Sequence, residues 1–407
     1  MGQGRILNRG ARTFGALVCA VLGLISLAWI VRDFDKADEA SHVWWTWAGI
    51  PYRLPDSIFG TSLADPLLLA VYVAAGIAAL RSSAAAGALG SAAAATVVLR
   101  LPSLWNLHAD WMQGIPDGLK TRAQLSSWAA VVLGGVLLAV VAAARRPADG
   151  TAADYAVSPV DSPPGRPRPG AAVTAALFLG AVAVVEGAWQ IYWAQKRGWD
   201  IYEHQLTGKY MLTTLLSPPG AWAAWTAIAL ALTAAFAAIG RAPLARPLGM
   251  TAAALVLGDG VSAISAYIKF DYLEHFDDLP TVGVLSVLTA FLEGIVGLVA
   301  LIVLAQPADP ADNPPLAGWG QPAAQPYGGY GGYGGYGPAD GGYGGAAGGG
   351  YGPADGGYGP TGGAGGGSGY TPPPPSPPTA PPGPPPATPP AAPPPPSSPP
   401  PPPPPGW

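Results

Sequence analysis

Eight long apolar stretches account for most of the first 305 residues, and they constrain the fold more than any other feature of the chain. A helix needs about 20 mostly apolar residues to cross a bilayer, and inside lipid every backbone polar group must find its partner within the protein. We therefore predict eight membrane-spanning helices over residues 14–31, 66–80, 84–99, 127–144, 171–194, 221–240, 248–268 and 281–305.

The composition fits a chain that is surrounded mostly by lipid. Half of the residues are hydrophobic and 11% are charged, whereas ordinary soluble domains have about 25% charged residues. The net charge of −4 excludes a broadly basic nucleic-acid binder. The single cysteine, Cys19, permits neither an intrachain disulfide nor a cysteine-based metal cluster. We expect the lipid bilayer as the main partner, no nucleic acid and no cofactor.

The charges between the predicted helices indicate how the chain is oriented. Residues 1–13, 81–83, 145–170 and 241–247 would lie on one side, and they carry 10 Arg against 3 Asp. The four connections on the other side carry 10 Lys or Arg against 14 Asp or Glu over twice the length. Because basic residues are enriched in cytoplasmic connections, we predict a multi-pass cell-membrane protein with both termini in the cytoplasm.

The tryptophans are distributed unequally between the two sides. Twelve of the 14 fall in the outer connections or at the outer ends of predicted helices, and the other two lie in the C-terminal tail. An interfacial belt of tryptophan usually forms at both faces of a membrane. The one-sided distribution favours a cap formed by the outer connections, with stacking on a lipid or a sugar as the alternative.

The two halves of the apolar region resemble each other when the chain is shifted by 160 residues. Arg81 then aligns with Arg241, and the run that begins at Ser91 aligns with the run that begins at Thr251. Each half holds four helices, an even number, so both halves would cross the membrane in the same direction. The predicted fold is an all-α integral membrane protein with eight transmembrane helices in two tandem, parallel four-helix repeats, followed by a disordered C-terminal tail.

We expect four segments in the chain. The first repeat covers residues 1–144, a Pro- and Arg-rich cytoplasmic linker covers 145–170, the second repeat covers 171–305, and the tail covers 306–407. The tail contains no Lys or Arg, and its last 37 residues include 24 prolines. Such a segment cannot bury enough apolar surface to offset the entropy of ordering, and its proline runs favour an extended conformation.

The tail has two interpretations. Spaced tyrosines and PxxP-type surfaces are typical of segments that bind the aromatic groove of a cytoplasmic protein partner. The alternative is a solvated spacer without a specific partner.

A Gly/Tyr-rich stretch followed by proline runs, on an alanine-rich membrane region, resembles many poorly characterised actinobacterial membrane proteins. The resemblance is one of composition, and it implies no activity.

Three carboxylates lie well inside predicted helices: Glu186, Asp259 and Glu293. A charge at the bilayer centre costs about 2.5–3.5 kcal/mol on insertion scales, and no Lys or Arg is predicted at comparable depth. Helical periodicity places each acid on a polar face. The intramembrane polar candidates are Glu186, Gln190, Asp259, Ser262, Ser265, Ser286, Thr289 and Glu293. They predict either a proton- or cation-coupled pathway, or protonated acids that hold helices together by hydrogen bonds.

One histidine falls in each outer connection, with carboxylates close to it in the sequence. Histidine and carboxylate side chains together can bind zinc or copper, or respond to acid pH. The candidate outer-face pH or metal cluster is His42, His108, His204 and His275. Because most polar residues of the membrane region lie in these connections, chance placement is the competing interpretation.

Asp33-Phe-Asp35 resembles the acidic metal-binding motif of membrane glycosyltransferases that use lipid-linked sugars. The resemblance covers three residues, and the chain contains no GxSxG, HExxH or GxxxxGK motif. We therefore predict no catalytic residues and no enzymatic activity. The leading functional prediction is an interaction or scaffold component of the cell envelope. The alternative is a proton- or cation-coupled transporter that uses the intramembrane carboxylates of the second repeat.

Overall fold

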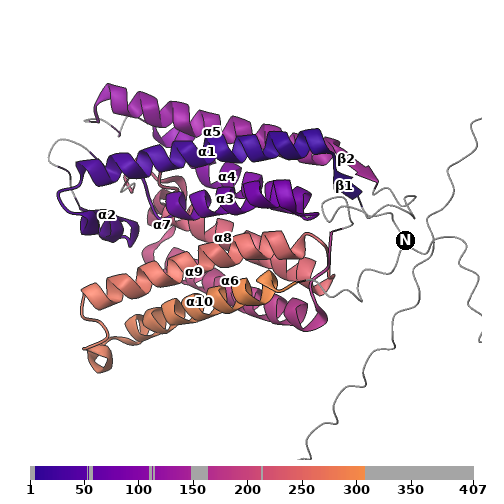
Figure 1. Ribbon diagram of the computed structural model, residues 1–407. Helices are drawn as coiled ribbons and strands as arrows, with labels where there is room; N and C mark the ends of the chain where they lie inside the picture. The colour runs from indigo at the N-terminus through magenta and orange to yellow at the C-terminus, as the bar shows by residue number, and fades with distance from the viewer. Residues whose placement is uncertain are drawn as a thin grey trace, which may run out of the picture. The chain divides into compact units, whose positions relative to one another are not determined.

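The computed structural model describes residues 5–52, 54, 58–109, 112, 115–147, 164–211 and 214–307. These residues form ten α-helices and a short two-stranded sheet, and the long helices run side by side (Figure 1). The predicted linker falls partly, and the tail from residue 308 onwards falls wholly, outside the described residues.

Eight of the helices are long and apolar enough to span a membrane, as the sequence predicts. They are α1 Arg9–Lys36, α3 Ala64–Arg81, α4 Ala85–Asn106, α5 Asp117–Ala143, α6 Pro169–Arg197, α8 Gly220–Ile239, α9 Ala245–Lys269 and α10 Thr281–Ala305. Many large apolar side chains on them point away from the protein, such as Leu24, which is 65% exposed. Exposed apolar faces on long helices are what a surrounding bilayer requires. The chain therefore has the architecture of a multi-pass membrane protein.

Most of these helices extend beyond the predicted apolar limits. The largest difference is in α5, which begins at Asp117 instead of residue 127. In α4 the helix continues to Asn106 instead of ending at Leu99. The α4 helix continues past Arg100, its first charged residue, and it also contains Pro102. The prediction failed here because apolar periodicity reports where lipid-facing residues end, whereas the helix itself ends later. For α10 the predicted and observed limits are the same.

Five of the described elements lie in segments that the sequence treats as loops, among them a single 3-10 turn, η1 Phe276–Asp278. Two short helices, α2 Ala40–Trp47 and α7 Trp199–Thr207, follow α1 and α6. Two strands, β1 Arg5–Leu7 and β2 Arg145–Pro147, pair in antiparallel fashion. Figure 1 shows the β1–β2 pair at one end of the helices and α2 at the other. The segment before α1 and the segment after α5 therefore lie at the same end.

Helix packing follows the same order in the two halves of the described chain. In the first half α1 contacts α3, α3 contacts α4, and α4 contacts α5. In the second half α6 contacts α8, α8 contacts α9, and α9 contacts α10. The core between these helices is rich in alanine, as in the pairs Ala75 and Ala92 of the first half and Ala231 and Ala252 of the second. Small side chains let membrane helices approach closely without a hydrophobic driving force.

The two halves meet along α4 and α9. Thr251 Oγ1 donates a hydrogen bond to Ser91 Oγ over 3.2 Å. A Cβ atom placed on Gly87 would lie 2.6 Å from Cγ of Pro247. In each of these pairs the two residues are 160 positions apart in the chain. Further contacts join α3 to α9 and α4 to α8, so the interface involves corresponding helices of the two halves.

The close packing of α9 on α10 generates a first prediction. A Cβ atom on Gly297 would lie 2.6 Å from the backbone nitrogen of Leu257, whereas a Cβ on Gly135 in α5 would meet nothing within 4 Å. We expect Gly297→Ala to lower the free energy of unfolding by about 1–3 kcal/mol, because the α9 backbone must shift. Gly135→Ala should leave stability unchanged or slightly higher. Thermal unfolding in nanodiscs measures both, and equal unfolding temperatures for the two variants would contradict the packing.

Candidate functional site: a carboxyl-lined cavity

The three intramembrane acids line a single cavity of about 420 Å³. Glu186 comes from α6, Asp259 from α9 and Glu293 from α10. The sequence places each acid on its own polar helix face, and the packing of three helices brings these faces to one space. The cavity therefore joins residues that are more than 100 positions apart in the chain.

The acids lie far from the ends of their helices. Glu293 is at the midpoint of α10, and Asp259 lies ten residues before the last residue of α9. Glu293 is 9% exposed, and Asp259 is open to the cavity that it lines. At this depth the bilayer offers no water to a carboxyl group, so the cavity supplies the polar surroundings of these side chains.

The contacts of the three carboxyl groups differ. The Glu186 and Glu293 side chains lie close enough for one carboxyl, when protonated, to donate a hydrogen bond to the other. The Asp259 carboxyl accepts no hydrogen bond from the described residues and pairs with none of their basic side chains; the nearby charge that acts on it is Glu186. One close pair of carboxyls thus lies beside one carboxyl without a partner in the described chain.

Both halves contribute to the wall of the cavity. The first half supplies the end of α2, with Thr46 and Trp47, and the start of α3 with the residues just before it. The second half supplies small residues of α8, such as Ala227, and the segment around Ser217. Among the described lining residues none is Lys, Arg or His. The cavity therefore runs from these connections to the middle of the helices, and the three acids line its inner part, near the middle of the helices.

The remaining members of the predicted polar set divide into two groups. Ser262 also lines the cavity, and its hydroxyl donates to the backbone oxygen of Asp259 over 2.9 Å. The other four are not among its described lining residues, and they make hydrogen bonds within or between helices; they are Gln190, Ser265, Ser286 and Thr289. Thr289, for example, accepts from Nε1 of Trp189 and so links α10 to α6. Only half of the predicted set shares the cavity.

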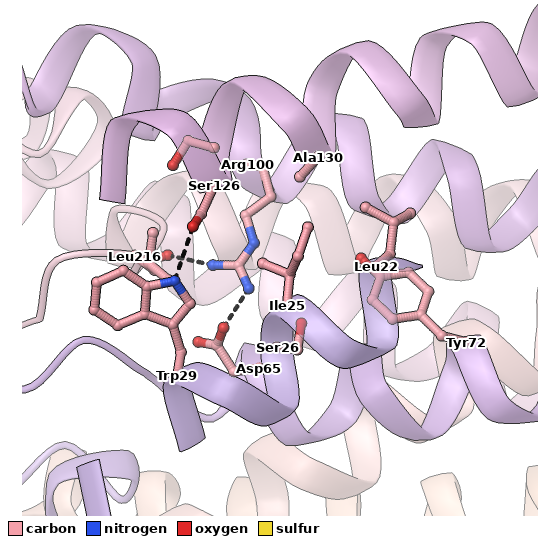
Figure 2. A pocket seen from close by; sticks show the side chains of 11 residues that line it. Leu22, Ile25, Ser26, Trp29, Asp65, Tyr72, Arg100, Ser126, Ala130 and Leu216 are labelled. Atoms are coloured by element: carbon pink, nitrogen blue, oxygen red, sulfur yellow. Dashed lines mark hydrogen bonds and ion pairs between the residues drawn. The ribbon is translucent and has the colours of Figure 1, made fainter. Parts of the chain in front are cut away.

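A buried ion pair in the first half was missed by the sequence analysis. Figure 2 shows the Arg100 guanidinium between the Asp65 carboxylate, with which it pairs, and the backbone oxygen of Leu216, to which it donates over 2.8 Å. Both charged residues were assigned to outer connections, because each stands next to the predicted end of an apolar stretch. In the structure both lie inside helices, α3 and α4, and both are buried. The sequence did contain an indication of this pair. An acidic and a basic residue stand next to the ends of two consecutive apolar stretches, and these two ends fall on the same predicted side of the membrane.

The outer connections of the two halves are joined by backbone hydrogen bonds next to this pair. The backbone nitrogens of Leu215 and Leu216 donate to the oxygens of Phe59 and Gly60, over 3.0 and 2.9 Å. Asp33, at the end of α1, accepts from the backbone nitrogens of Gly60 and Thr61 and from the Thr61 hydroxyl. The loop that leads into the cavity wall is therefore held from both sides.

The same contacts bear on the Asp33-Phe-Asp35 motif. Asp33 is fully buried and its oxygens accept from the loop at Gly60 and Thr61. The Asp35 side chain is 69% exposed and pairs with Lys36 over 3.2 Å. The two carboxylates do not converge on a shared site, so the resemblance to a metal-binding DxD motif gains no support from the geometry.

The four histidines make local contacts. His42 stacks on Tyr52, His204 lies edge-on to Tyr210, and the Nδ1 atoms of His108 and His275 lie within hydrogen-bond distance of backbone oxygens one turn earlier. In the part of the chain that the structure describes, no group of three or more His, Cys, Asp or Glu side chains is placed to hold a metal ion. A pH or metal role for these histidines stays a prediction.

Indole N–H groups join the two halves in the part of the protein that we predict to be its outer side. Trp222 in α8 donates to the backbone oxygen of Val98 in α4, and Trp105 in α4 donates to that of Thr207 in α7. The two rings lie edge to face, with centroids 5.6 Å apart. These contacts connect the two halves, and they favour the interpretation of the outer tryptophans as part of a cap.

No protein-family model, curated protein or solved structure matches this chain. The eight apolar helices define the class, a multi-pass helical membrane protein. Its function has to be argued from the residues of its own cavity.

The buried ion pair generates a second prediction. Arg100→Met leaves Asp65 buried without a cation, and breaking a buried pair in this way costs about 3–5 kcal/mol of unfolding free energy. The double variant Asp65→Asn/Arg100→Met removes both charges and should recover part of that loss. Thermal unfolding in nanodiscs measures the difference. A double variant that is as unstable as Arg100→Met would show that the pair is not the source of the effect.

Proposed function

We propose that this chain is a membrane transport protein that moves protons or a cation through the cavity between its two halves. Glu186, Asp259 and Glu293 are the groups that bind them. The observation that carries this proposal is the convergence of three carboxyl groups on one cavity of about 420 Å³ whose described lining has no basic residue. The geometry favours this function over the scaffold role, which rests on the tail.

The physical basis is the cost of an unpaired charge in the membrane. An ionised carboxylate at the bilayer centre costs about 2.5–3.5 kcal/mol or more. A proton or a cation can remove that cost, so the two compete for the same carboxyl groups. A proton shared between the neighbouring carboxyls of Glu186 and Glu293 would be one such ligand. Exchange of this proton for a cation is the elementary step of coupled transport.

The purely structural interpretation explains part of the site. A protonated Glu293 bonded to Glu186 would hold α10 against α6 without any transport role. Asp259 does not fit that interpretation, because its carboxyl accepts no hydrogen bond from the described residues and faces the cavity. A carboxyl that stabilises no contact of the fold is better explained by a ligand or a proton that comes and goes.

The proposal includes a duplication of the four-helix unit. In each half a long helix is followed by a short helix and three further long helices. The contacts of Ser91 with Thr251 and of Gly87 with Pro247 join residues 160 positions apart, and equivalent residues touch each other where a two-fold axis passes between them. We propose two parallel repeats about an axis along the membrane normal, with the site at their interface, an arrangement that suits alternating access.

The orientation and the tail complete the proposal. The end that carries β1 and β2 also carries the Arg-rich connections, and the enrichment of basic residues in cytoplasmic connections supports our proposal that this end is cytoplasmic. The tail lies outside the described residues from residue 308 onwards. Binding of a cytoplasmic partner by its proline runs, and a scaffold role in the cell envelope, stay predictions.

Vesicle flux tests the transport proposal. The full chain is reconstituted into vesicles that contain a pH-sensitive dye, and a pH gradient is imposed with Na⁺, K⁺ or an organic ammonium ion on one side. We expect the protein to dissipate the gradient with at least one of these ions. Flux should fall to the leak of protein-free vesicles in the variant Glu186→Gln/Asp259→Asn/Glu293→Gln, because amides neither ionise nor exchange protons.

The control removes three acids of the same kinds from the exposed outer connections: Glu203→Gln/Glu274→Gln/Asp277→Asn. This variant should keep the flux of the unmodified protein. The proposal is wrong if the cavity variant is folded and transports as fast as this control, or if the unmodified protein never exceeds the leak.

A further inference from the structure

We propose that the cavity binds a small organic cation with N–H donors and an apolar body, such as a protonated alkyl or arylalkyl amine, rather than a bare metal ion. The inference rests on the proposed function and names the class of solute for the same cavity. It comes from the size of the cavity, the chemistry of its wall and the unused acceptors at its inner part.

The size argues against a metal ion. A volume of about 420 Å³ falls in the range of about 300–1,000 Å³ that small-molecule sites occupy. A metal ion instead needs several ligands converging at about 2.0–2.6 Å. Glu186, Asp259 and Glu293 line one cavity, yet the described residues contain no group of three acidic, His or Cys side chains placed to hold a metal. The three acids line a space that has room for an organic molecule.

The inner part of the cavity is built to accept N–H donors. Glu293 is 9% exposed and has no basic partner among the described side chains. The Asp259 carboxyl accepts no hydrogen bond from that part of the chain. An ammonium group carries three N–H donors and a positive charge, so it can satisfy several carboxyl oxygens at once through charge-assisted hydrogen bonds. Ser262 adds a hydroxyl at the same level.

The rest of the wall suits a hydrocarbon. Along α8 the lining side chains are all apolar, and four of the five are alanine: Ala223, Ala224, Ala227, Ile228 and Ala231. Toward the outer side lies Trp47, whose indole N–H already donates to Thr61 Oγ1 over 3.0 Å. Its remaining contribution is the aromatic ring, which interacts well with apolar groups and with cations. The wall therefore fits an amine oriented with its ammonium group inward and its apolar body toward α2 and α8.

Binding to the purified full chain in nanodiscs tests the inference. The probes are phenethylammonium, its neutral analogue 2-phenylethanol, and the metal ions Na⁺, Mn²⁺ and Zn²⁺, each measured by titration calorimetry against protein-free nanodiscs. We expect saturable binding of phenethylammonium, at least about tenfold weaker binding of the neutral alcohol, and no saturable binding of the metals. Comparable binding of the amine and the alcohol would overturn the inference, and so would saturable metal binding that Asp259→Asn removes.

Two variants locate the site. Asp259→Asn and, separately, Glu186→Gln should each weaken phenethylammonium binding at least about tenfold. The exposed control Glu274→Gln should bind like the unmodified protein. Thermal unfolding shows which variants are folded. Two variants are used so that the site can still be tested if one of them does not fold. Unchanged binding in a folded cavity variant would overturn the inference.

The flux experiment separates this inference from the proposed function. If the acids support proton or Na⁺ flux but no amine binds, the solute class is wrong and the transport proposal stands. If phenethylammonium binds at the acids but no ion or amine is transported, the cavity is a binding site and the transport proposal is wrong.

Discussion

The structure depends on how a charge inside the membrane is neutralised. In the first half the protein itself neutralises the charge, because Arg100 pairs with the buried Asp65. Arg100 also donates a hydrogen bond to the backbone oxygen of Leu216 in the other half. In the second half the described residues offer no such cation to Glu186, Asp259 and Glu293, and the three acids surround a cavity instead. A paired charge holds a fold together, whereas carboxyls without a cation require protons or a ligand. The two halves thus differ in how their buried charges are neutralised.

This division explains how similar helix arrangements take different roles. At the offset of 160 residues, Asp259 corresponds to Leu99 and Glu293 to Leu133, so the first half has no equivalent acids. Arg100 corresponds to Gly260, whose missing side chain allows the backbone of α10 to approach α9 at Gly294. The first half, with its ion pair and its loop held by Asp33, forms a stable wall. The second half supplies the chemical groups of the site.

The sequence predicts the eight helices well, because a helix that faces lipid needs a continuous run of apolar residues, and such a run can be recognised in each stretch by itself. It identifies Glu186, Asp259 and Glu293 for the same reason, since a charge in such a stretch is conspicuous. It misses the pair of Asp65 and Arg100, because a boundary drawn at the first charged residue removes that residue from the helix. The shared cavity is also beyond the sequence, because it depends on how α6, α9 and α10 pack against the first half.

The proposed transport requires that the cavity around Asp259 is reachable from water and attracts cations. Replacing the buried Cys19 by Ala and introducing Ser262→Cys places a single thiol at this position. We expect a cationic methanethiosulfonate reagent to modify this thiol faster than an anionic reagent of similar size, and Asp259→Asn to remove most of the difference. A thiol that reacts with neither reagent, or equally fast with both, would contradict the proposal.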